Sequence, residues 1–207
     1  MSNKKIVIVG YSGHAYVVLD AIIQSGNIPI YYSDKNINQA NPYKLEYIGF
    51  ENDIHFTGWG MNFSFVICIG DNYLRQKIGE LIVNKLEDVG SVIHPNSSIS
   101  QFATIGKGVF VSKGVMVNPF SKIGDFVILN TGCIIEHECV ISDYAHIAPG
   151  AVLAGNVVIG RRSFIGANAV IKQGVVVGDD VIVGAGSVVL KDIPNNSKVV
   201  GNPSKNI

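Results

Sequence analysis

The most regular feature of the chain is an aliphatic residue at every sixth position from Ile93 to Val189, without an insertion. Four positions after these residues stands a small or β-branched residue, from Ser97 to Ser187. An amphipathic strand repeats every two residues and a helix every 3.6, so neither produces a period of six with one large and one small apolar position. The pattern predicts a three-sided solenoid in which each hexad forms a short strand and a corner, and three hexads complete a coil.

Residue types that tolerate positive φ recur three positions after the aliphatic residue, where the coils should bend. They are Asn96, Gly108, Gly114, Gly132, Gly150, Asn156, Asn168, Gly174, Asp180 and Gly186. Because the ends of a solenoid expose apolar edges, we expect the preceding domain to cover one end and the tail DIPNNSKVVGNPSKNI to cap the other. A β-sandwich is the alternative fold, and it does not explain an unbroken sixfold register.

The first 90 residues follow a different pattern. KKIVIVG predicts a buried strand, GYSGH a tight loop, AYVVLDAIIQSG a helix ending at Gly26, and IPIYYSD a second strand. After a polar stretch over 35–63, FSFVICIG predicts a third strand, DNYLRQKIGELIVNKLED a helix, and GSVI a strand leading into the solenoid. This order predicts an α/β domain with a small, parallel, Rossmann-like sheet over 1–90, followed by an all-β domain over 91–207.

Composition narrows the function classes. Only 15% of the residues are charged, 16 basic residues balance 16 acidic ones, and there is no basic stripe, so we expect no nucleic-acid partner. The apolar run after MSNKK is too short for a signal peptide and no stretch approaches a membrane span, so we expect a cytoplasmic protein with no membrane partner. Cys133 and Cys139 occupy inward positions six apart, which favours packing over nucleophilic roles.

Three loops of the first domain fall on the carboxyl edge of its predicted sheet, where ligands of open α/β sheets bind. The loop from Gly10 to His14 joins a strand to a helix whose N–H groups can hold a phosphate. It lacks the full G-x-G-x-x-G motif, so a purely structural turn is the alternative. Asp34 ends the second strand and could meet a ribose hydroxyl or stay a solvated turn residue, and Gly70 ends the third strand.

The corner after Ile135 departs from the pattern of the solenoid, because His137 stands there between Glu136 and Glu138. Acyl transfer from a thioester needs a base, and a neutral imidazole held by a carboxylate suits that task. A surface corner that happens to carry these residues is the alternative.

His146 lies half a coil beyond His137, so one chain cannot place both on one face, and a neighbouring copy would have to bring them together. It could contact a ligand or be a buried structural histidine. The histidine spacing also argues against a three-histidine zinc site, and we expect no metal.

The segments GYSGH, CIGDN, NTGCIIEHECVISDYAHIAPGAVLAGNVVIG and VVGNPSKNI resemble those of the bacterial hexapeptide-repeat sugar acetyltransferases. Within the sialic acid O-acetyltransferase-like family, the chain is most similar to the UDP-4-amino-sugar N-acetyltransferases of the bacillosamine pathway. The resemblance covers nearly the whole chain. It implies a left-handed parallel β-helix, acetyl-CoA as co-substrate, and a homotrimer with active sites between subunits.

The same resemblance implies roles for individual residues. His137 would be the general base and Glu138 would increase its basicity, while His146 would contact acetyl-CoA. Backbone of the coenzyme groove would come from Gly155, Ala167 and Ala185, with the Gly155 N–H as an oxyanion donor. The nucleotide sugar would bind at Ser12, Gly13, His14, Asp34, Lys35 and Gly70, with Lys35 standing where relatives often carry an acid.

We therefore expect acetylation of the 4-amino group of a UDP-linked 4-amino-4,6-dideoxy sugar by direct attack of the amine on the thioester. Two alternatives remain at this point. One is an O-acetyltransferase acting on sialic acid or another sugar hydroxyl, and the other is a non-catalytic scaffold that binds a nucleotide sugar.

Overall fold

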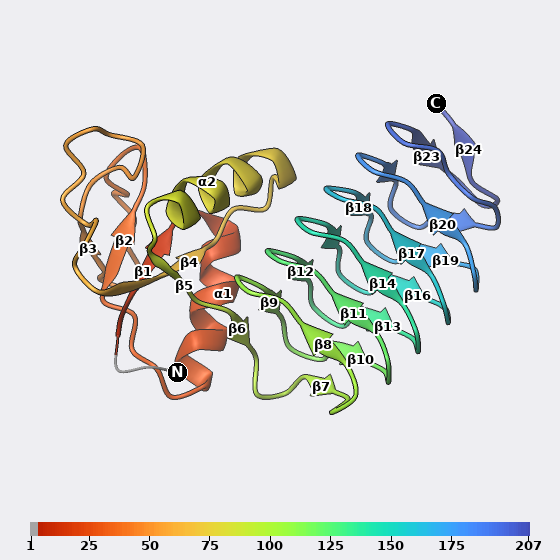
Figure 1. The fold of residues 1–207 in the computed structure, drawn as a ribbon, viewed down its shortest axis with the longest axis horizontal. Coiled ribbons are helices and arrows are strands. Elements are labelled where there is room, and N and C mark those ends of the chain that lie inside the picture. Colours follow the sequence, from red (N-terminus) through yellow and green to blue (C-terminus); the bar gives the residue numbers. More distant parts are fainter. Residues whose placement is uncertain (1–3) are drawn as a thin grey trace.

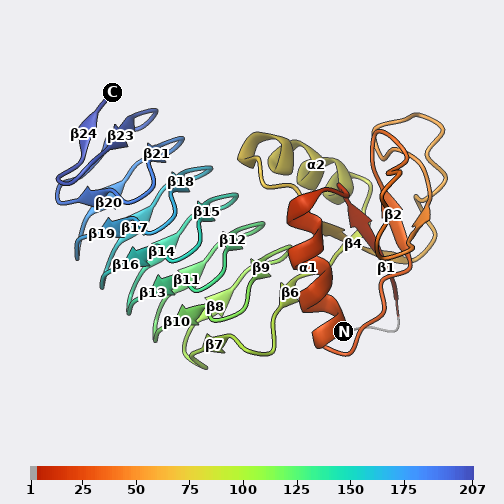
Figure 2. The same ribbon diagram turned by 180° about the vertical axis from the view of Figure 1, so that it is seen from behind.

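The computed structural model describes residues 4–207, which form an α/β domain beside a parallel β-helix (Figures 1 and 2). Residues 1–3 of the first predicted domain lie outside the described residues. Five parallel strands in the order β3-β2-β1-β4-β5 make the α/β sheet. Its elements are β1 (Lys5–Val9), α1 (Gly13–Gln24), β2 (Tyr31–Ser33), β3 (Glu46–Tyr47), β4 (Phe63–Ile67), α2 (Asn72–Asn84) and β5 (Asp88–Val89). The predicted Rossmann-like sheet is confirmed, and its strand order reverses between β1 and β4.

Two details of this domain differ from the sequence prediction. The second helix ends at Asn84 instead of continuing to Asp88, and Leu86 takes a left-handed φ of 59°. The chain then returns as β5 to pair with β4, so the last strand of the sheet is one that the sequence did not indicate. Two-residue strands such as β3 and β5 are too short to leave a hydrophobic period.

The β-helix has three flat faces, each a sheet of parallel strands 18 residues apart, except for β23 and β24 at the C-terminal end of face 1. Face 1 contains β6 (Val92–Ile93), β9 (Phe110–Val111), β12 (Ile128–Leu129), β15 (His146–Ile147), β18 (Phe164–Ile165), β21 (Ile182–Val183), β23 (Lys198–Val200) and β24 (Lys205–Asn206). Face 2 contains β7 (Ser98–Ile99), β10 (Met116–Val117), β13 (Ile134–Ile135), β16 (Val152–Leu153), β19 (Val170–Ile171) and β22 (Val188–Val189). Face 3 contains β8 (Thr104–Ile105), β11 (Lys122–Ile123), β14 (Val140–Ile141), β17 (Val158–Ile159) and β20 (Val176–Val177). We call the bends between them corners 1–2, 2–3 and 3–1.

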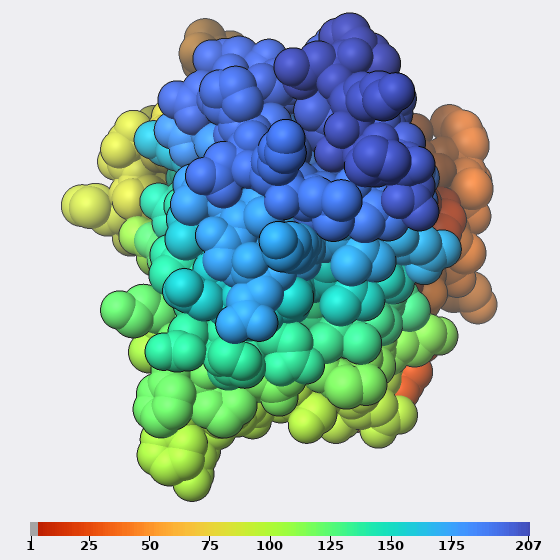
Figure 3. All heavy atoms as spheres, turned by 90° about the vertical axis from the view of Figure 1, so that its right-hand side faces the viewer, coloured from red at the N-terminus to blue at the C-terminus, as the bar shows by residue number. Residues whose placement is uncertain are grey.

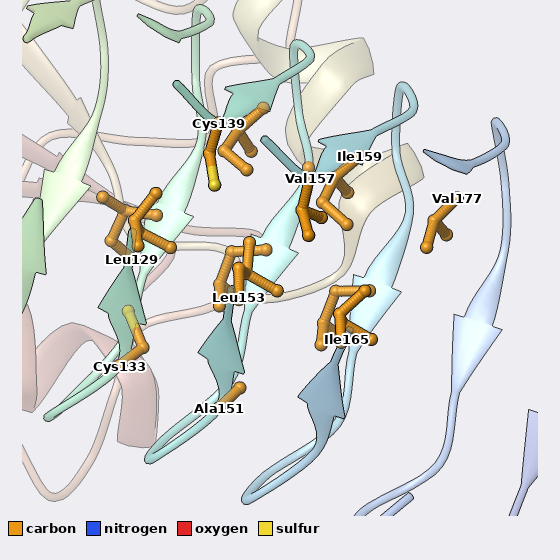
Figure 4. Close-up of a cluster of buried hydrophobic side chains, with 14 of the residues drawn as sticks. Leu129, Cys133, Cys139, Ala151, Leu153, Val157, Ile159, Ile165 and Val177 are labelled. Atoms are coloured by element: carbon orange, nitrogen blue, oxygen red, sulfur yellow. The ribbon is translucent and has the colours of Figure 1, made fainter. Parts of the chain in front are cut away.

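The inside of the β-helix is filled by the two residues of each hexad that the sequence pattern singled out. Figure 4 shows large residues such as Leu129 and Leu153 beside small ones such as Cys133 and Ala151, all fully buried. Because successive coils pair in register, each large residue stacks on the one 18 positions away. The thiols of Cys133 and Cys139 are part of this apolar interior, and burial raises the pKa of both.

The bends follow the sequence prediction at nine of the ten expected positions, which all have positive φ. Asn96, in the first coil, is the exception, because its N–H donates to Nδ1 of His94 instead. Five larger residues also take this conformation, which is strained for them, with φ between 56° and 64°. They are Phe120, Phe126, Glu138, Tyr144 and Arg162.

Both ends of the solenoid are in contact with other segments, but in different ways. At the C-terminal end, β23 pairs with β21, and β24 folds back antiparallel on β23, over the last coils (Figure 3). The N-terminal domain packs against the side of the first coils instead of only over their end. Val92, Phe110 and Ile128 of face 1 share a core with residues of α1. No helix within residues 4–207 is long and apolar enough to cross a membrane.

Candidate active site

His137 projects from corner 2–3, on the coil that begins with β12. Its backbone is fixed between neighbouring coils, because its carbonyl accepts from the Asn156 N–H at 2.8 Å and the Glu138 N–H donates to the Pro119 carbonyl at 3.0 Å. Its side chain is 50% exposed. A rigid backbone thus presents a solvent-accessible imidazole.

Glu138 orients this imidazole. Neighbouring side chains of an extended strand point to opposite sides, but Glu138 has φ 61° and ends that alternation. Its Oε2 lies 3.1 Å from Nδ1 of His137. When the ring is neutral, this contact favours the tautomer with the proton on Nδ1 and leaves the lone pair of Nε2 free to accept a proton.

Gly155 lies one coil beyond His137 and supports the ring. A Cβ at residue 155 would stand 2.5 Å from both Cε1 and Nε2 of His137. No side chain fits in that space without moving the ring. The glycine of the A-G-N segment is therefore required by the position of the imidazole, which lies directly against backbone.

His146 has a very different environment, because it lies on β15 under the N-terminal domain and is 8% exposed. Its Nε2 is 3.2 Å from Nδ2 of Asn130, and its Nδ1 is 3.4 Å from the Gly70 carbonyl. The Asn130 amide is oriented by the Thr131 N–H, which donates to Oδ1 at 2.8 Å. Nδ2 of Asn130 is therefore the donor to His146, so Nδ1 of His146 carries the proton and faces Gly70.

Burial and a nearby cation keep His146 and its neighbour His14 uncharged. Desolvation, and to a lesser degree the charges of Arg75 and His14, lower the pKa of His146 to about 3, although the Gly70 carbonyl acts in the opposite direction. Desolvation, followed by Arg75, lowers the pKa of His14 to about 4. The two rings are 6.3 Å apart. Neither is suited to accept a proton near pH 7.

The N-terminus of α1 is open to solvent. Its N-cap residue Ser12 makes no side-chain capping bond, whereas Asp71 caps α2 by accepting from the Leu74 N–H at 2.8 Å. Ser12 and Gly13 are exposed, and a Cβ added at Gly13 or Gly70 would meet no other atom within 4 Å. The first turn of α1 thus offers backbone donors and space to an anion.

Asp34 joins this loop to the end of β2. Its Oδ2 accepts from the Tyr11 N–H at 2.7 Å and its Oδ1 from the Lys35 N–H at 2.6 Å. Lys35 is exposed beside a cavity of about 240 Å³ at the carboxyl ends of β2 and β3. That cavity is lined by Lys35, Tyr47, Ile48, Gly49, Phe50, Asp53, His55 and Phe56.

Comparison with known proteins shows to which family the chain belongs. The family model described as the PglD N-terminal domain matches residues 5–82, and the bacterial transferase hexapeptide model (six repeats) matches residues 156–191. The acetyltransferase domain of PglB from Neisseria gonorrhoeae, solved in complex with acetyl coenzyme A, is 32% identical, with a TM-score of 0.92 and 100% of both chains covered. The chain belongs to the hexapeptide-repeat sugar N-acetyltransferases. Its solenoid is accordingly the left-handed parallel β-helix.

Other solved structures agree with this assignment. A histidine variant of perosamine N-acetyltransferase from Caulobacter crescentus, in complex with CoA and GDP-perosamine, is 33% identical, with a TM-score of 0.91 over 100% of this chain and 98% of that one. WeeI from Acinetobacter baumannii AYE is 26% identical, with a TM-score of 0.88 over 99% and 100% of the two chains. Among curated proteins, no sequence matches the chain.

Within one copy of this acetyltransferase, the sequence-predicted residues form two separate groups. His137, Glu138 and Gly155 share corner 2–3. The other group lies on the side of the N-terminal domain, where Gly70 and His14 adjoin His146. Its sheet edge also carries Ser12, Gly13, Asp34 and Lys35, and corner 1–2 carries Ala167 (half-buried) and Ala185 (exposed). Face 2 separates the two groups.

Sequence reasoning missed three residues that build the second group of this acetyltransferase. Asn130 orients His146, and Asn72 donates to the Arg162 carbonyl at 2.6 Å, joining α2 to the solenoid. Arg75 is buried at the junction of α2 and the solenoid. The available signal was the buried face of α2, where Asn72 and Arg75 precede Ile78 and Ile82 at helical spacing, so that a cation interrupts an apolar stripe.

Proposed function

We propose that the protein transfers the acetyl group of acetyl-CoA to the 4-amino group of a UDP-linked 4-amino-4,6-dideoxy sugar, with His137 as general base. The observation that carries the proposal is the pair of His137 and Glu138, in which the carboxylate engages Nδ1 and leaves Nε2 at an exposed corner. The relatives solved with acetyl coenzyme A, or with CoA and GDP-perosamine, support the two substrate classes.

In the proposed reaction, the sugar amine attacks the carbonyl carbon of the thioester while Nε2 of His137 takes a proton from it. A C–N bond forms, and the carbonyl oxygen becomes an oxyanion for which the Gly155 N–H is the candidate donor. The C–S bond then breaks. His137 returns its proton to the thiolate of CoA, so that the base is regenerated. Glu138 stabilises the imidazolium that exists between these steps.

The nucleotide sugar would bind along the carboxyl edge of the α/β sheet. The open first turn of α1, with Ser12 and Gly13, suits the diphosphate, because it combines unpaired N–H groups with space for close approach. Asp34 and Lys35 would face the ribose, and the neighbouring cavity could take the base. Gly70 and His14 would then adjoin the sugar ring.

The coenzyme would use the remaining predicted residues, the backbone of Gly155, Ala167 and Ala185 together with His146. Both nitrogens of His146 already have partners, Asn130 and Gly70. Contact of this residue with acetyl-CoA would therefore use the carbon edge of the ring or exchange one of these bonds.

A homotrimer would join the two groups of site residues. Face 2 carries an outward apolar column that has no polar member from β10 to β22, formed by Met116, Ile134, Val152, Val170 and Val188. Met116 and Val170 are 47% and 40% exposed in the single chain. Three copies turned with this face toward a common axis would bury the column and bring corner 2–3 of one copy against corner 1–2 of the next.

This sharing can be tested by mixing two inactive variants. His137→Ala removes the base from one group, and Gly13→Glu places a carboxylate at the diphosphate site of the other. When the two chains are co-expressed with different tags and purified as mixed trimers, about a third of the sites should combine two intact groups and regain activity. Mixed trimers no more active than either parent would contradict a shared site.

The substrate assignment is tested by measuring CoA release with UDP-, GDP- and dTDP-linked 4-amino sugars, and with sialic acid as hydroxyl acceptor. We expect the UDP-linked amine to have the highest kcat/KM. A higher value for the hydroxyl acceptor would establish the O-acetyltransferase alternative. Absence of acetyl-CoA binding by calorimetry would instead favour the non-catalytic scaffold.

A further inference from the structure

Arg75 is a buried cation at the junction of the two domains. It lies on α2, is 1% exposed, and donates to groups from both sides of the junction. Nε bonds the Phe126 carbonyl at 2.9 Å, and Nη2 bonds the Tyr144 carbonyl and Oδ1 of Asn72 at 2.6 and 2.7 Å. Nη1 bonds the Ile69 and Gly70 carbonyls at 3.0 Å each.

No carboxylate within residues 4–207 forms an ion pair with this guanidinium. A buried charge without a counter-ion is costly unless its hydrogen-bonding capacity is filled, and here backbone carbonyls fill it. Phe126 and Tyr144 take strained, left-handed backbone conformations at corner 3–1, where their carbonyls accept from Arg75. Their rings stack 5.0 Å apart, and the ring of Phe126 lies against Gly79 of α2. This apolar packing would be enough to hold the domains together. A buried cation without a counter-ion at the same junction therefore needs a further explanation.

The Gly70 carbonyl provides that explanation, because it receives two donors. One is Nη1 of Arg75 and the other is Nδ1 of His146, 3.4 Å away. A carbonyl held by Arg75 selects the tautomer of His146 with the proton on Nδ1, in agreement with the Asn130 amide on the other side of the ring. The guanidinium also disfavours a second positive charge on His146 or His14.

Apart from Arg75, the groups around His146 are uncharged near pH 7. From α1 it faces His14, from α2 Arg75, from face 1 the ring of Phe164 at 5.0 Å, and from corner 1–2 Asn130. Arg75 is thus the only permanent charge that acts on the ring from these elements of the described chain.

We propose that Arg75 is a positioning residue of the nucleotide-sugar half of the site, which fixes the tautomer and the uncharged state of His146 through the Gly70 carbonyl. The catalytic part of this inference depends on the proposed function, while its structural part does not. An uncharged His146 suits the proposed reaction. The attacking amine gains positive charge in the transition state, and a nearby imidazolium would destabilise that charge.

The experiment uses the full chain labelled at histidine Cε1 and follows each ring by NMR between pH 2 and pH 8, because the pKa of His146 is about 3. Signals of His14 and His146 are assigned with His14→Gln and His146→Gln. Arg75→Gln removes the charge, and Arg75→Lys keeps it but cannot span the same carbonyls. Arg162→Met is the matched control, because Arg162 bonds Gln76 of α2 and Asp180 at the same junction.

In Arg75→Gln the titration midpoint of His146 should rise by about one pH unit or more relative to the wild type. It should stay unchanged in Arg75→Lys and in Arg162→Met. Equal midpoints in Arg75→Gln and the wild type would overturn the proposal. They would show that Arg75 only links the two domains and does not control the protonation of His146. This readout needs no turnover, so it stands even if the substrate assignment fails.

Kinetics give a second, independent measure. Both Arg75 variants should raise KM for the nucleotide sugar about tenfold, since Gly70 would adjoin the sugar ring, whereas Arg162→Met should leave it unchanged. If Arg75→Gln does not fold, Arg75→Lys decides alone. An unchanged KM for the nucleotide sugar in that variant would then overturn the proposal.

Discussion

His137 and His146 are nine residues apart in the chain and occupy opposite kinds of environment. His137 is half exposed at a corner, with a carboxylate on one nitrogen and the other nitrogen free. His146 is buried beneath a second domain, with both nitrogens engaged by uncharged groups. The chemical role of a histidine therefore follows from its partners and its solvation. One solenoid therefore carries an exposed imidazole with one free nitrogen and a buried imidazole that is uncharged near pH 7.

The strongest test of this comparison removes the exposed ring. His137→Ala should lower kcat by about 10²- to 10⁴-fold, the usual contribution of a general base, because His146, the other solenoid histidine of the proposed site, is buried with both nitrogens engaged. The Tm should change little, since the side chain is exposed. Stopped-assay kinetics and thermal denaturation measure both. A variant with normal kcat would end the assignment of His137 as base.

A smaller effect is expected when the ring is displaced and not removed. Gly155→Ala introduces a Cβ 2.5 Å from Nε2 of His137, so the imidazole must rotate away from its place. We expect a loss of about 100-fold in kcat with KM values nearly unchanged. The KM values are the internal control, because unchanged values show that both substrates still bind. Equal activity in Gly155→Ala and the wild type would show that the ring does not act from its position against residue 155.

The buried ring should reveal itself in the pH dependence of stability. The pKa of His146 is lowered to about 3 in the folded chain and is near 6.5 when unfolded, so the unfolded state binds the proton between these values. The contribution of the neutral His146 to the free energy of unfolding is therefore complete above pH 6.5 and is lost as the pH falls. Between pH 7 and pH 5 the wild type should lose roughly 2 kcal/mol more free energy of unfolding than His146→Gln does.

Urea denaturation at both pH values, at one protein concentration, gives this difference. Between pH 8 and pH 9 the two proteins should change alike, which is the control, because His146 is neutral there in both the folded and the unfolded state. Parallel curves for His146→Gln and the wild type would mean that His146 titrates normally in the folded chain.

The smallest expected effect comes from the partner of the exposed ring. Glu138→Gln keeps the size of the side chain and removes its charge, so the tautomer is less well defined and the imidazolium less stabilised. A loss of about tenfold in kcat/KM should result, measured against Glu136→Gln on the other side of His137. If the two variants behaved alike, the contact of 3.1 Å with Nδ1 would have no special role.

Much of the fold could be predicted from the sequence. The solenoid, its bends and the Rossmann-like sheet follow from short periods and from turn residues, whose effects are local. The strands β3 and β5 could not be predicted, because two residues carry no period. The sequence predicted that the N-terminal domain covers the end of the solenoid, but not that it also packs against the side of face 1. The outward apolar residues Phe110 and Ile128 do not reveal this, because they could equally have faced another copy.

The sequence by itself determined the repeat, the corner that carries His137, and the adjacency of Glu138, because neighbours along a chain stay neighbours in the fold. Only the tertiary structure decided what surrounds His146. Gly70 and Arg75 come to that ring from segments more than 70 residues away, through the docking of α2 on the solenoid, and Asn130 contacts it from the preceding coil. Such contacts depend on how two surfaces pack, and no period in either segment encodes that arrangement.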